Sequence, residues 1–244
     1  MIDLVAGARQ RGEAIQAFQR REIERIASDP AWAREASRLD HYSRVGDWPG
    51  AVAGTRILEL GCGPGRYAAL FASLGCDVVA ADPASFDTWM LIERHHRVEF
   101  LAGVRAEALP FADATFDAVA CLGALLYFDD PDAACAEMRR VLRPRGHLIV
   151  RSINRRNLYT RVRRRAIDPA SKQLHTMNEL VRLLASHEFA ASTCFSYGCY
   201  APFWPGYWWY LMNGVISLAA QQWLSDATPE TARTNHIVFA QRAN

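Results

Sequence analysis

Residues 57–67 read ILELGCGPGRY. An apolar run enters a loop with three glycines, and a helical pattern follows over 66–73. Glycine accepts positive φ and lets a ligand approach the backbone closely. A strand, a glycine-rich turn and a helix in this order are typical of the edge at which open α/β sheets bind ligands. The sequence therefore predicts a ligand-binding loop at Gly61, Gly63 and Gly65.

Short apolar runs alternate with helical patterns along most of the chain. The expected strands are RILEL (56–60), DVVAAD (77–82), VEFLA (98–102), FDAVACL (116–122), GHLIVRS (146–152) and HIVFAQR (236–242), with a further apolar run, ASTCFSY, at 191–197. The expected helices are 9–27, 30–39, 66–73, 131–142 and 176–186, the second opened by an Asp29 N-cap and Pro30. Strands that alternate with helices predict βαβ units and a parallel sheet covered on both faces. We therefore expect an α/β, doubly wound fold.

The composition is that of a folded protein with a large core. The chain has 244 residues, of which 50% are apolar and 22% charged, with a mean hydropathy of -0.09. A chain of this length is expected to form one domain of ordinary to large size. The first residues, MIDLVAGARQRGEAI, lack the apolar region of a secretory signal, and no run reaches the roughly 18 consecutive apolar residues of a membrane-spanning helix. We therefore expect a cytoplasmic protein.

Cysteine spacing and net charge argue against two classes of function. The six cysteines contain no C-x-x-C pair, so we expect free thiols and no metal site. The formal net charge of +2 argues against a general nucleic-acid binder. The charge is uneven, because residues 139–165 hold 11 Arg and no acidic residue. The part of this run from Arg151 to Arg165 is either a solvated face or a contact for an anionic substrate group or an acidic lipid surface.

Two acidic residues limit what the glycine loop can hold. Asp82 ends the second expected strand, 21 residues after Gly61, where a carboxylate can accept hydrogen bonds from two ribose hydroxyls. Glu59 lies beside the loop, where it favours a positively charged ligand over a pyrophosphate. Arg66 takes the sixth position, where the dinucleotide fingerprint has glycine, and no Gly-Lys-Ser or Gly-Lys-Thr of a P-loop follows. S-adenosylmethionine meets these limits, because it is a nucleoside with a sulfonium and an ammonium group.

Four segments resemble one enzyme family in their order and spacing. They are ILELGCGPGRY (57–67), VVAADP (78–83), AEALPFADATFDAV (106–119) and ALLYFDDPDAACAEMRRVLRPRGHLIV (124–150). In them the chain resembles the class I S-adenosylmethionine-dependent methyltransferases, and most of all the small-molecule branch that includes the ubiquinone and menaquinone enzymes. The resemblance covers residues 56–152.

The resemblance implies a site for S-adenosylmethionine, with S-adenosylhomocysteine as the product. The loop around the methionine part would consist of Glu59, Gly61, Cys62, Gly63 and Gly65. Asp82, with Pro83 beside it, would take the ribose hydroxyls. Main-chain groups of Cys121 and Leu122, at the end of the fourth strand, would face the methionine end.

On the adenine side the chain departs from the family pattern. The resemblance implies that Ala106 and Glu107 lie beside the adenine ring, with the N–H of Ala106 reaching a ring nitrogen. The family often has Gly-Asp before this pair, and the Asp binds the adenine amino group. Val104 and Arg105 stand there in this chain, so a different group has to meet the amino group.

The resemblance also implies how the chain is divided. The sheet would have seven strands, with the last one antiparallel. A single methyltransferase domain would cover 1–244, made of an N-terminal helical lid (1–50), a cofactor-binding core (51–152), a basic insertion (153–176) and an aromatic insertion that lines the substrate pocket (198–233).

The segment between Phe195 and Tyr210 holds nine aromatic residues, more than core packing easily absorbs. We predict that it forms a pocket for an aromatic or lipophilic small-molecule acceptor. The alternative is a homodimer interface, so the sequence leaves monomer and homodimer open.

Three residues are candidates for acting on the acceptor. His41 lies in the loop before the first strand, where relatives fold a lid, and His175 precedes a helix. Either could be a general base near neutral pH. Tyr127 falls where relatives carry a residue that faces the substrate. Each could instead be structural, since a buried tyrosine hydroxyl is usually bonded and Thr176 with Glu179 has capping-box spacing.

Methyl transfer from a sulfonium mainly requires that the acceptor and the methyl group be aligned. We predict a methyltransferase that moves a methyl group to an O or N of a small aromatic or heteroaromatic molecule by in-line displacement. One alternative is the same chemistry on a lipid or lipid-linked acceptor, with peripheral contact to a membrane. Another is a regulatory module that binds S-adenosylmethionine without catalysis. No nucleic-acid partner is expected, because no base-pocket motif accompanies the basic run.

Overall fold

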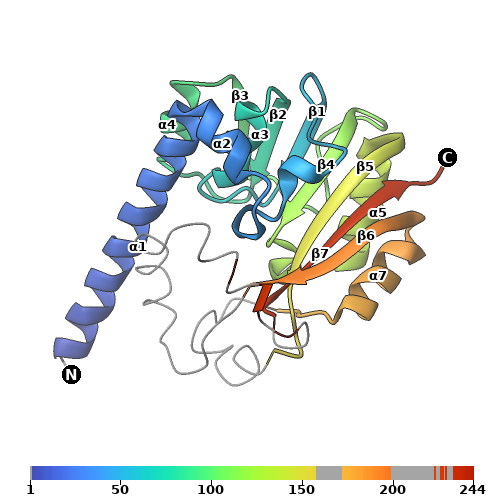
Figure 1. Ribbon diagram of the computed structural model, residues 1–244. Helices are drawn as coiled ribbons and strands as arrows, with labels where there is room; N and C mark the ends of the chain where they lie inside the picture. The colour runs from blue at the N-terminus through green and yellow to red at the C-terminus, as the bar shows by residue number, and fades with distance from the viewer. Residues whose placement is uncertain (1, 158–171, 199–222, 224–225, 228, 230–232) are drawn as a thin grey trace.

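A computed structural model describes residues 2–157, 172–198, 223, 226, 227, 229 and 233–244 (Figure 1). Its centre is a seven-stranded sheet with the order β3-β2-β1-β4-β5-β7-β6. The strands are β1 (Arg56–Leu60), β2 (Asp77–Asp82), β3 (Val98–Ala102), β4 (Phe116–Leu122), β5 (Leu142–Ile153), β6 (Phe189–Tyr197) and β7 (Asn235–Arg242). The α/β prediction is therefore confirmed, and every apolar run that we assigned to a strand forms one.

Among the described strands, β7 is the one that runs antiparallel to both of its neighbours. Strands β1 to β5 pair in parallel, whereas β7 runs antiparallel to both β5 and β6. The implied antiparallel last strand is thus confirmed. The chain moves outward from β1 through β2 to β3 and then returns to β4 on the other side of β1. The carboxyl ends of β1 and β4 therefore form the switch point at which open α/β sheets bind ligands.

Helices cover both faces of the sheet (Figure 1). One face carries α1 (Ile2–Ser28), α2 (Pro30–Ala36), α3 (Arg66–Ser73) and α4 (Trp89–Glu93), and the other carries α5 (Pro131–Val141) and α7 (Met177–Ser186). Three short 3-10 helices, η1 (Asp40–Tyr42), η2 (Val45–Asp47) and η3 (Leu125–Tyr127), lie in the connections. Each face buries its own apolar cluster, so the core consists of two layers separated by the sheet.

Strand alternation assigns the polar residues at the carboxyl edge to the two faces. The apolar cluster under α1 and α3 includes Ile57, Ala80 and Ile149. Side chains two positions apart on a strand lie on the same face, so Glu59 and Asp82 also lie on that face. By the same alternation Arg151 joins them, and Tyr197 is buried in that cluster. Ser152, Ser196 and His236 lie on the face that carries α5 and α7. The edge therefore has two distinct polar sides.

Local signals set several helix ends. Asp29 caps α2, with its Oδ1 accepting a hydrogen bond from the Trp32 N–H at 3.1 Å, as its position before Pro30 predicts. Thr176 and Glu179 form the predicted capping box of α7. Other ends differ from the prediction: α1 begins at Ile2 and not at residue 9, and α2 ends three residues before residue 39, ahead of η1. The five-residue α4 gave no periodic signal to predict.

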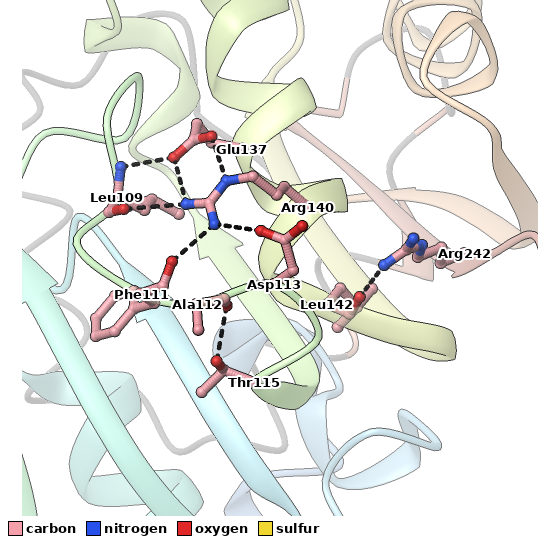
Figure 2. Close-up of polar contacts among 9 residues, drawn as sticks. All are labelled: Leu109, Phe111, Ala112, Asp113, Thr115, Glu137, Arg140, Leu142 and Arg242. Atoms are coloured by element: carbon pink, nitrogen blue, oxygen red, sulfur yellow. Dashed lines mark hydrogen bonds and ion pairs between the residues drawn. The ribbon is translucent and has the colours of Figure 1, made fainter.

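One arginine fixes the connection between β3 and β4. The Arg140 guanidinium of α5 forms a two-point ion pair with Glu137 and donates to the carbonyls of Leu109 and Phe111 at 3.0 and 2.7 Å (Figure 2). Glu137 in turn accepts the Leu109 N–H at 2.7 Å. The Arg140 hydrogen bond lowers the pKa of Glu137 despite its partial burial. These charge-assisted bonds hold the connection from β3 to β4, which also contains Ala106 and Glu107.

No helix in the described part of the chain is both long and apolar enough to span a membrane. Two predicted segments fall largely outside the described residues. The basic insertion is described only over 153–157 and 172–176, and most of the aromatic insertion, including 199–222, is not described.

Candidate active site

The glycine loop follows β1 at the switch point, with Gly61, Gly63 and Gly65 all at positive φ (66°, 51° and 88°). The N–H groups of Gly61 and Cys62 both donate to the Ala81 carbonyl, at 2.8 and 3.2 Å. A Cβ on Gly61 would lie 2.2 Å from the Cβ of Ala124, whereas one on Gly63 would meet nothing within 4 Å. Gly61 is therefore needed for close packing against the connection after β4, and Gly63 leaves its side of the loop open.

We expect Gly61→Ala and Gly63→Ala to differ in stability. Both place a side chain at positive φ, which costs about 1 kcal/mol. Gly61→Ala also forces its Cβ against a Cβ fixed to the backbone, so its loss should reach about 3 kcal/mol. Urea unfolding of the two variants measures the difference. Equal losses would contradict the packing role of Gly61.

Asp82 connects the glycine loop to the turn after β2. Its Oδ2 accepts the Gly63 N–H at 2.9 Å, and its Oδ1 accepts the Ala84 N–H at 2.9 Å. The turn holds the loop from the other side as well, because Thr88 Oγ1 donates to the Pro64 carbonyl at 2.7 Å and Trp89 Nε1 donates to the Gly63 carbonyl at 2.8 Å. Thr88 and Trp89 were missed in the sequence, since neither follows a motif.

Glu59 brings a buried carboxyl to the same loop. The residue is 2% exposed, and its Oε2 accepts no hydrogen bond within the described part of the chain. Burial raises the pKa of Glu59 well above its ordinary value, although the Ala68 backbone opposes the shift; Asp82 raises this pKa further and Arg151 lowers it. A buried carboxyl without a full set of partners is costly unless a cation approaches it. The residues therefore fit the cationic methionine end of S-adenosylmethionine.

The end of β4 lies next to this loop. Cys121 is buried on the face of the sheet that carries α5 and α7. Burial raises the pKa of its thiol to about 12, so the thiol stays protonated and is not a nucleophile. The Leu122 carbonyl accepts a hydrogen bond from Arg151 Nη2 at 3.0 Å. A carbonyl has a second lone pair, so the implied main-chain contact to the cofactor stays a prediction.

Glu107, which the resemblance places beside the adenine, contacts other residues of the protein. Its Oε1 accepts the N–H of Asp129 at 2.8 Å, and its Oε2 lies 3.5 Å from Arg105 Nη2. Arg105 also pairs with Asp129 at 2.5 Å, and Asp129 pairs with Lys172. Arg105 is thus engaged with acidic residues in the place where the family often has an Asp. The roles of Ala106 and Glu107 beside adenine stay predictions.

His41 belongs to a charged cluster that joins α1, η1 and α3. Its Nε2 lies 3.1 Å from Glu22 Oε1, which also accepts the Tyr42 hydroxyl at 2.9 Å. Arg66 lies 3.5 Å from that carboxylate and donates to the His41 carbonyl at 2.8 Å. Burial alone would raise the pKa of Glu22, but Arg66, His41 and Tyr42 lower it to about 2. Burial, and then Arg66, lower the pKa of His41, so this imidazole is neutral at pH 7.

A second polar cluster lies between the ends of β5, β6 and α3. Arg151 Nη1 donates to the Tyr67 hydroxyl at 3.0 Å. Ser43 Oγ lies 2.8 Å from the same hydroxyl and 3.0 Å from that of Tyr197. The sequence analysis included Arg151 in the basic run and Tyr197 in the aromatic segment, whereas it gave Ser43 and Tyr67 no role. The available signal was an arginine that interrupts the apolar run of β5, at the strand end where ligands bind.

The three predicted catalytic residues do not come together. His41 lies on the α1 and α3 side with Glu59, whereas the Nδ1 of His175 lies 3.4 Å from Ser152 Oγ, on the side of α7. Tyr127 lies in η3 and is 44% exposed, so it is not the buried tyrosine of the structural alternative. Their catalytic roles stay predictions, and His41 shares a side of the sheet with Glu59 and Asp82.

The fold and this edge define a class of protein. Residues 58–150 match the family described as "Methyltransferase domain". An S-adenosylmethionine-dependent methyltransferase from Mesorhizobium loti superposes with a TM-score of 0.60 at 14% identity, over 85% of this chain and 100% of that one. One from Methanosarcina mazei gives 0.56 at 19% identity, over 83% and 98%. These structures share the fold, which is that of the class I methyltransferases, and residues 58–150 match the methyltransferase domain family.

Two relatives resemble the chain more closely in sequence. A demethylmenaquinone methyltransferase from Renibacterium salmoninarum is 39% identical over 132 residues, covering 50% of this chain and 54% of the relative. A ubiquinone biosynthesis O-methyltransferase from Xanthomonas oryzae is 33% identical over 132 residues, covering 52% and 53%. Over the matched stretch the chain is similar to methyltransferases named for quinone compounds, as its motifs implied. The matches span about half the length of each relative.

Proposed function

We propose that this protein is an S-adenosylmethionine-dependent methyltransferase that methylates an O or N of a small, lipophilic aromatic molecule of quinone-like size. The observation that carries the proposal is the pair of carboxyls at the glycine loop. Glu59 presents a buried oxygen that accepts no hydrogen bond from the described residues, and Asp82 holds the loop through Gly63. An acidic pair beside a loop without a phosphate-binding motif suits a cationic nucleoside.

Each residue of the loop has a definite task in this proposal. Asp82 would accept the ribose hydroxyls, Glu59 would face the positive methionine end, and Gly63 offers open space beside the loop. When bound, S-adenosylmethionine supplies an electrophilic methyl group, which the acceptor atom takes in line as the carbon–sulfur bond breaks and leaves S-adenosylhomocysteine. The protein has to align the acceptor and exclude water.

The acceptor class rests on the relatives and on the sequence. Both relatives are named for quinone compounds, which are lipophilic ring molecules. Most of the aromatic insertion, which we predict to line the pocket, lies outside the described residues. Of the three catalytic candidates we retain His41 as a proton acceptor, because it is neutral at pH 7, oriented by Glu22 and on the side of Glu59.

The first test titrates S-adenosylhomocysteine into the protein by calorimetry, with NAD as the control. We expect micromolar binding of S-adenosylhomocysteine and none of NAD. A second assay incubates the protein with S-adenosylmethionine and a panel of catechols and naphthohydroquinones, and mass spectrometry looks for one added methylene unit. Binding without any product would favour the regulatory module, and no binding would overturn the proposal.

A further inference from the structure

We infer that the side chains of Thr88 and Trp89, at the start of α4, are positioning residues that hold the glycine loop in the form that binds S-adenosylmethionine and so raise the affinity of the site. The inference rests on the proposed function, because it concerns the same cofactor loop. Both side chains act through the main chain of the loop, which is the part that would contact the cofactor.

The loop is in contact with α4 at three successive residues. Trp89 Nε1 donates to the Gly63 carbonyl at 2.8 Å. Thr88 Oγ1 donates to the carbonyl of the next residue, Pro64, at 2.7 Å. At Gly65 an added Cβ would lie 2.6 Å from a methyl group of α4, so the helix packs directly against the loop there. The path of the loop is therefore set from the side of α4 as well as from β1.

Gly63 is held on both of its sides. Its N–H donates to Asp82 Oδ2 at 2.9 Å, and its carbonyl accepts the hydrogen bond from Trp89. The two peptide groups that flank this glycine are thus fixed, while the space that a Cβ would occupy stays open to a ligand. A loop that is already ordered loses less conformational freedom when a ligand binds, so more of the interaction energy appears as affinity.

The two donors are themselves directed at the loop. Trp89 is buried, and its ring stacks on Phe100 of β3 with the ring centroids 4.7 Å apart and the planes inclined by 10°. Thr88 is the N-cap residue of α4, where a threonine usually accepts a backbone N–H of its own helix. Its side chain makes no such capping bond and donates to Pro64 instead. Neither side chain is therefore explained by the stability of α4 alone.

The test compares variants by calorimetric titration of S-adenosylhomocysteine. Trp89→Phe keeps a ring that can stack on Phe100 and loses the N–H, so we expect about fivefold weaker binding, as for the loss of one neutral hydrogen bond. Thr88→Val keeps the shape of the side chain and removes the hydroxyl, so its loss should be about the same. Thr88→Ser retains the hydroxyl and should bind nearly as well as the wild type.

Trp48→Phe is the matched control for the tryptophan variant. Trp48 is also buried, and its Nε1 has no hydrogen-bond partner in the part of the chain that the structure describes. Its ring packs against Phe71, near the end of α3 that is further from the loop. The same substitution therefore removes no bond to the loop, and we expect wild-type affinity for S-adenosylhomocysteine.

Hydrogen exchange of the unliganded proteins measures the order of the loop directly. The amides of residues 61–67 should exchange faster in Trp89→Phe and Thr88→Val than in the wild type, because opening of the loop no longer breaks the bond to α4. The same amides should keep the wild-type rate in Trp48→Phe. A loss of overall stability would instead speed exchange in all parts of the core, so this measurement separates a held loop from a damaged fold.

The outcomes separate this inference from the proposed function. If the wild type binds S-adenosylhomocysteine and both Trp89→Phe and Thr88→Val bind it equally well, the positioning role is wrong and the cofactor site stands. The role is also wrong if exchange of residues 61–67 stays at the wild-type rate in these variants, or rises as much in Trp48→Phe. If the wild type binds no S-adenosylhomocysteine, the proposed function fails and the inference with it. Thr88→Val, the milder change, decides the question if Trp89→Phe does not fold.

Discussion

Asp82→Ala is expected to weaken S-adenosylhomocysteine binding by about a hundredfold. The carboxylate would lose two hydrogen bonds to the ribose, each worth about 1.5 kcal/mol when one partner is charged. The change also releases the N–H groups of Gly63 and Ala84, which Asp82 holds at 2.9 Å, so the glycine loop loses its connection to the turn after β2. Calorimetric titration measures the affinity directly.

Asp87→Ala is the matched control for this experiment. Asp87 lies in the same turn, but its side chain is 73% exposed and pairs with Arg20 at 3.1 Å. We expect this variant to bind S-adenosylhomocysteine as the wild type does, because an exposed pair contributes little. Asp82→Asn should fall between the two, since it keeps one acceptor oxygen and loses the charge. Wild-type affinity in Asp82→Ala would exclude Asp82 from the cofactor site.

Glu59→Gln is expected to stabilise the protein and to weaken S-adenosylmethionine binding in the same molecule. Burial raises the pKa of Glu59, so above its ordinary pKa the folded protein holds a proton that the unfolded chain releases. The stability that this carboxyl contributes is therefore lost as the pH rises from its ordinary pKa toward its raised pKa in the folded protein. Glutamine carries no charge to bury, and we expect a gain on the order of 1 kcal/mol at pH 8, about 3 °C in Tm.

The pH dependence distinguishes this effect from a change in packing. At pH 4 the carboxyl is largely protonated in both states, so the gain of Glu59→Gln should vanish there. Binding should change in the opposite direction, with S-adenosylmethionine affinity about tenfold lower at pH 8 because the cation loses its buried counter-charge. Glu99→Gln, on the exposed side of β3, provides the control. A gain that persists at pH 4, or unchanged affinity, would contradict the role of Glu59.

Local patterns predicted the central strands well because β1, β2 and β4 are nearly continuous apolar runs. Such runs need burial on both faces, and the βα order then fixes the neighbours. The capping residues Asp29 and Thr176 were predictable for a similar reason, since each bonds to a residue three positions away. The conformation of the glycine loop and the place of Asp82 at a strand end were predictable because both follow from the local sequence.

The polar clusters could not be predicted in this way. Ser43 and Tyr197 are 154 positions apart, and Glu22 and Tyr42 are 20 apart, so no local spacing indicates that they meet. Only the packing of α1 and α3 on the sheet brings them together. His41 was selected for its place in the chain, and its partner Glu22 became visible only in the fold. Arg151 was counted in a basic run although its neighbours in space are tyrosines.

The position of β7 has a consequence for the order in which the molecule folds. Strand β7 lies between β5 and β6, and β6 pairs with no other described strand. During synthesis β6 leaves the ribosome before the strand that it needs, so it has an unpaired edge that invites wrong association until residue 242 is made. Tyr197, at the end of β6, reaches Ser43 only after that step, so the cluster in which Ser43 joins the hydroxyls of Tyr67 and Tyr197 is completed last.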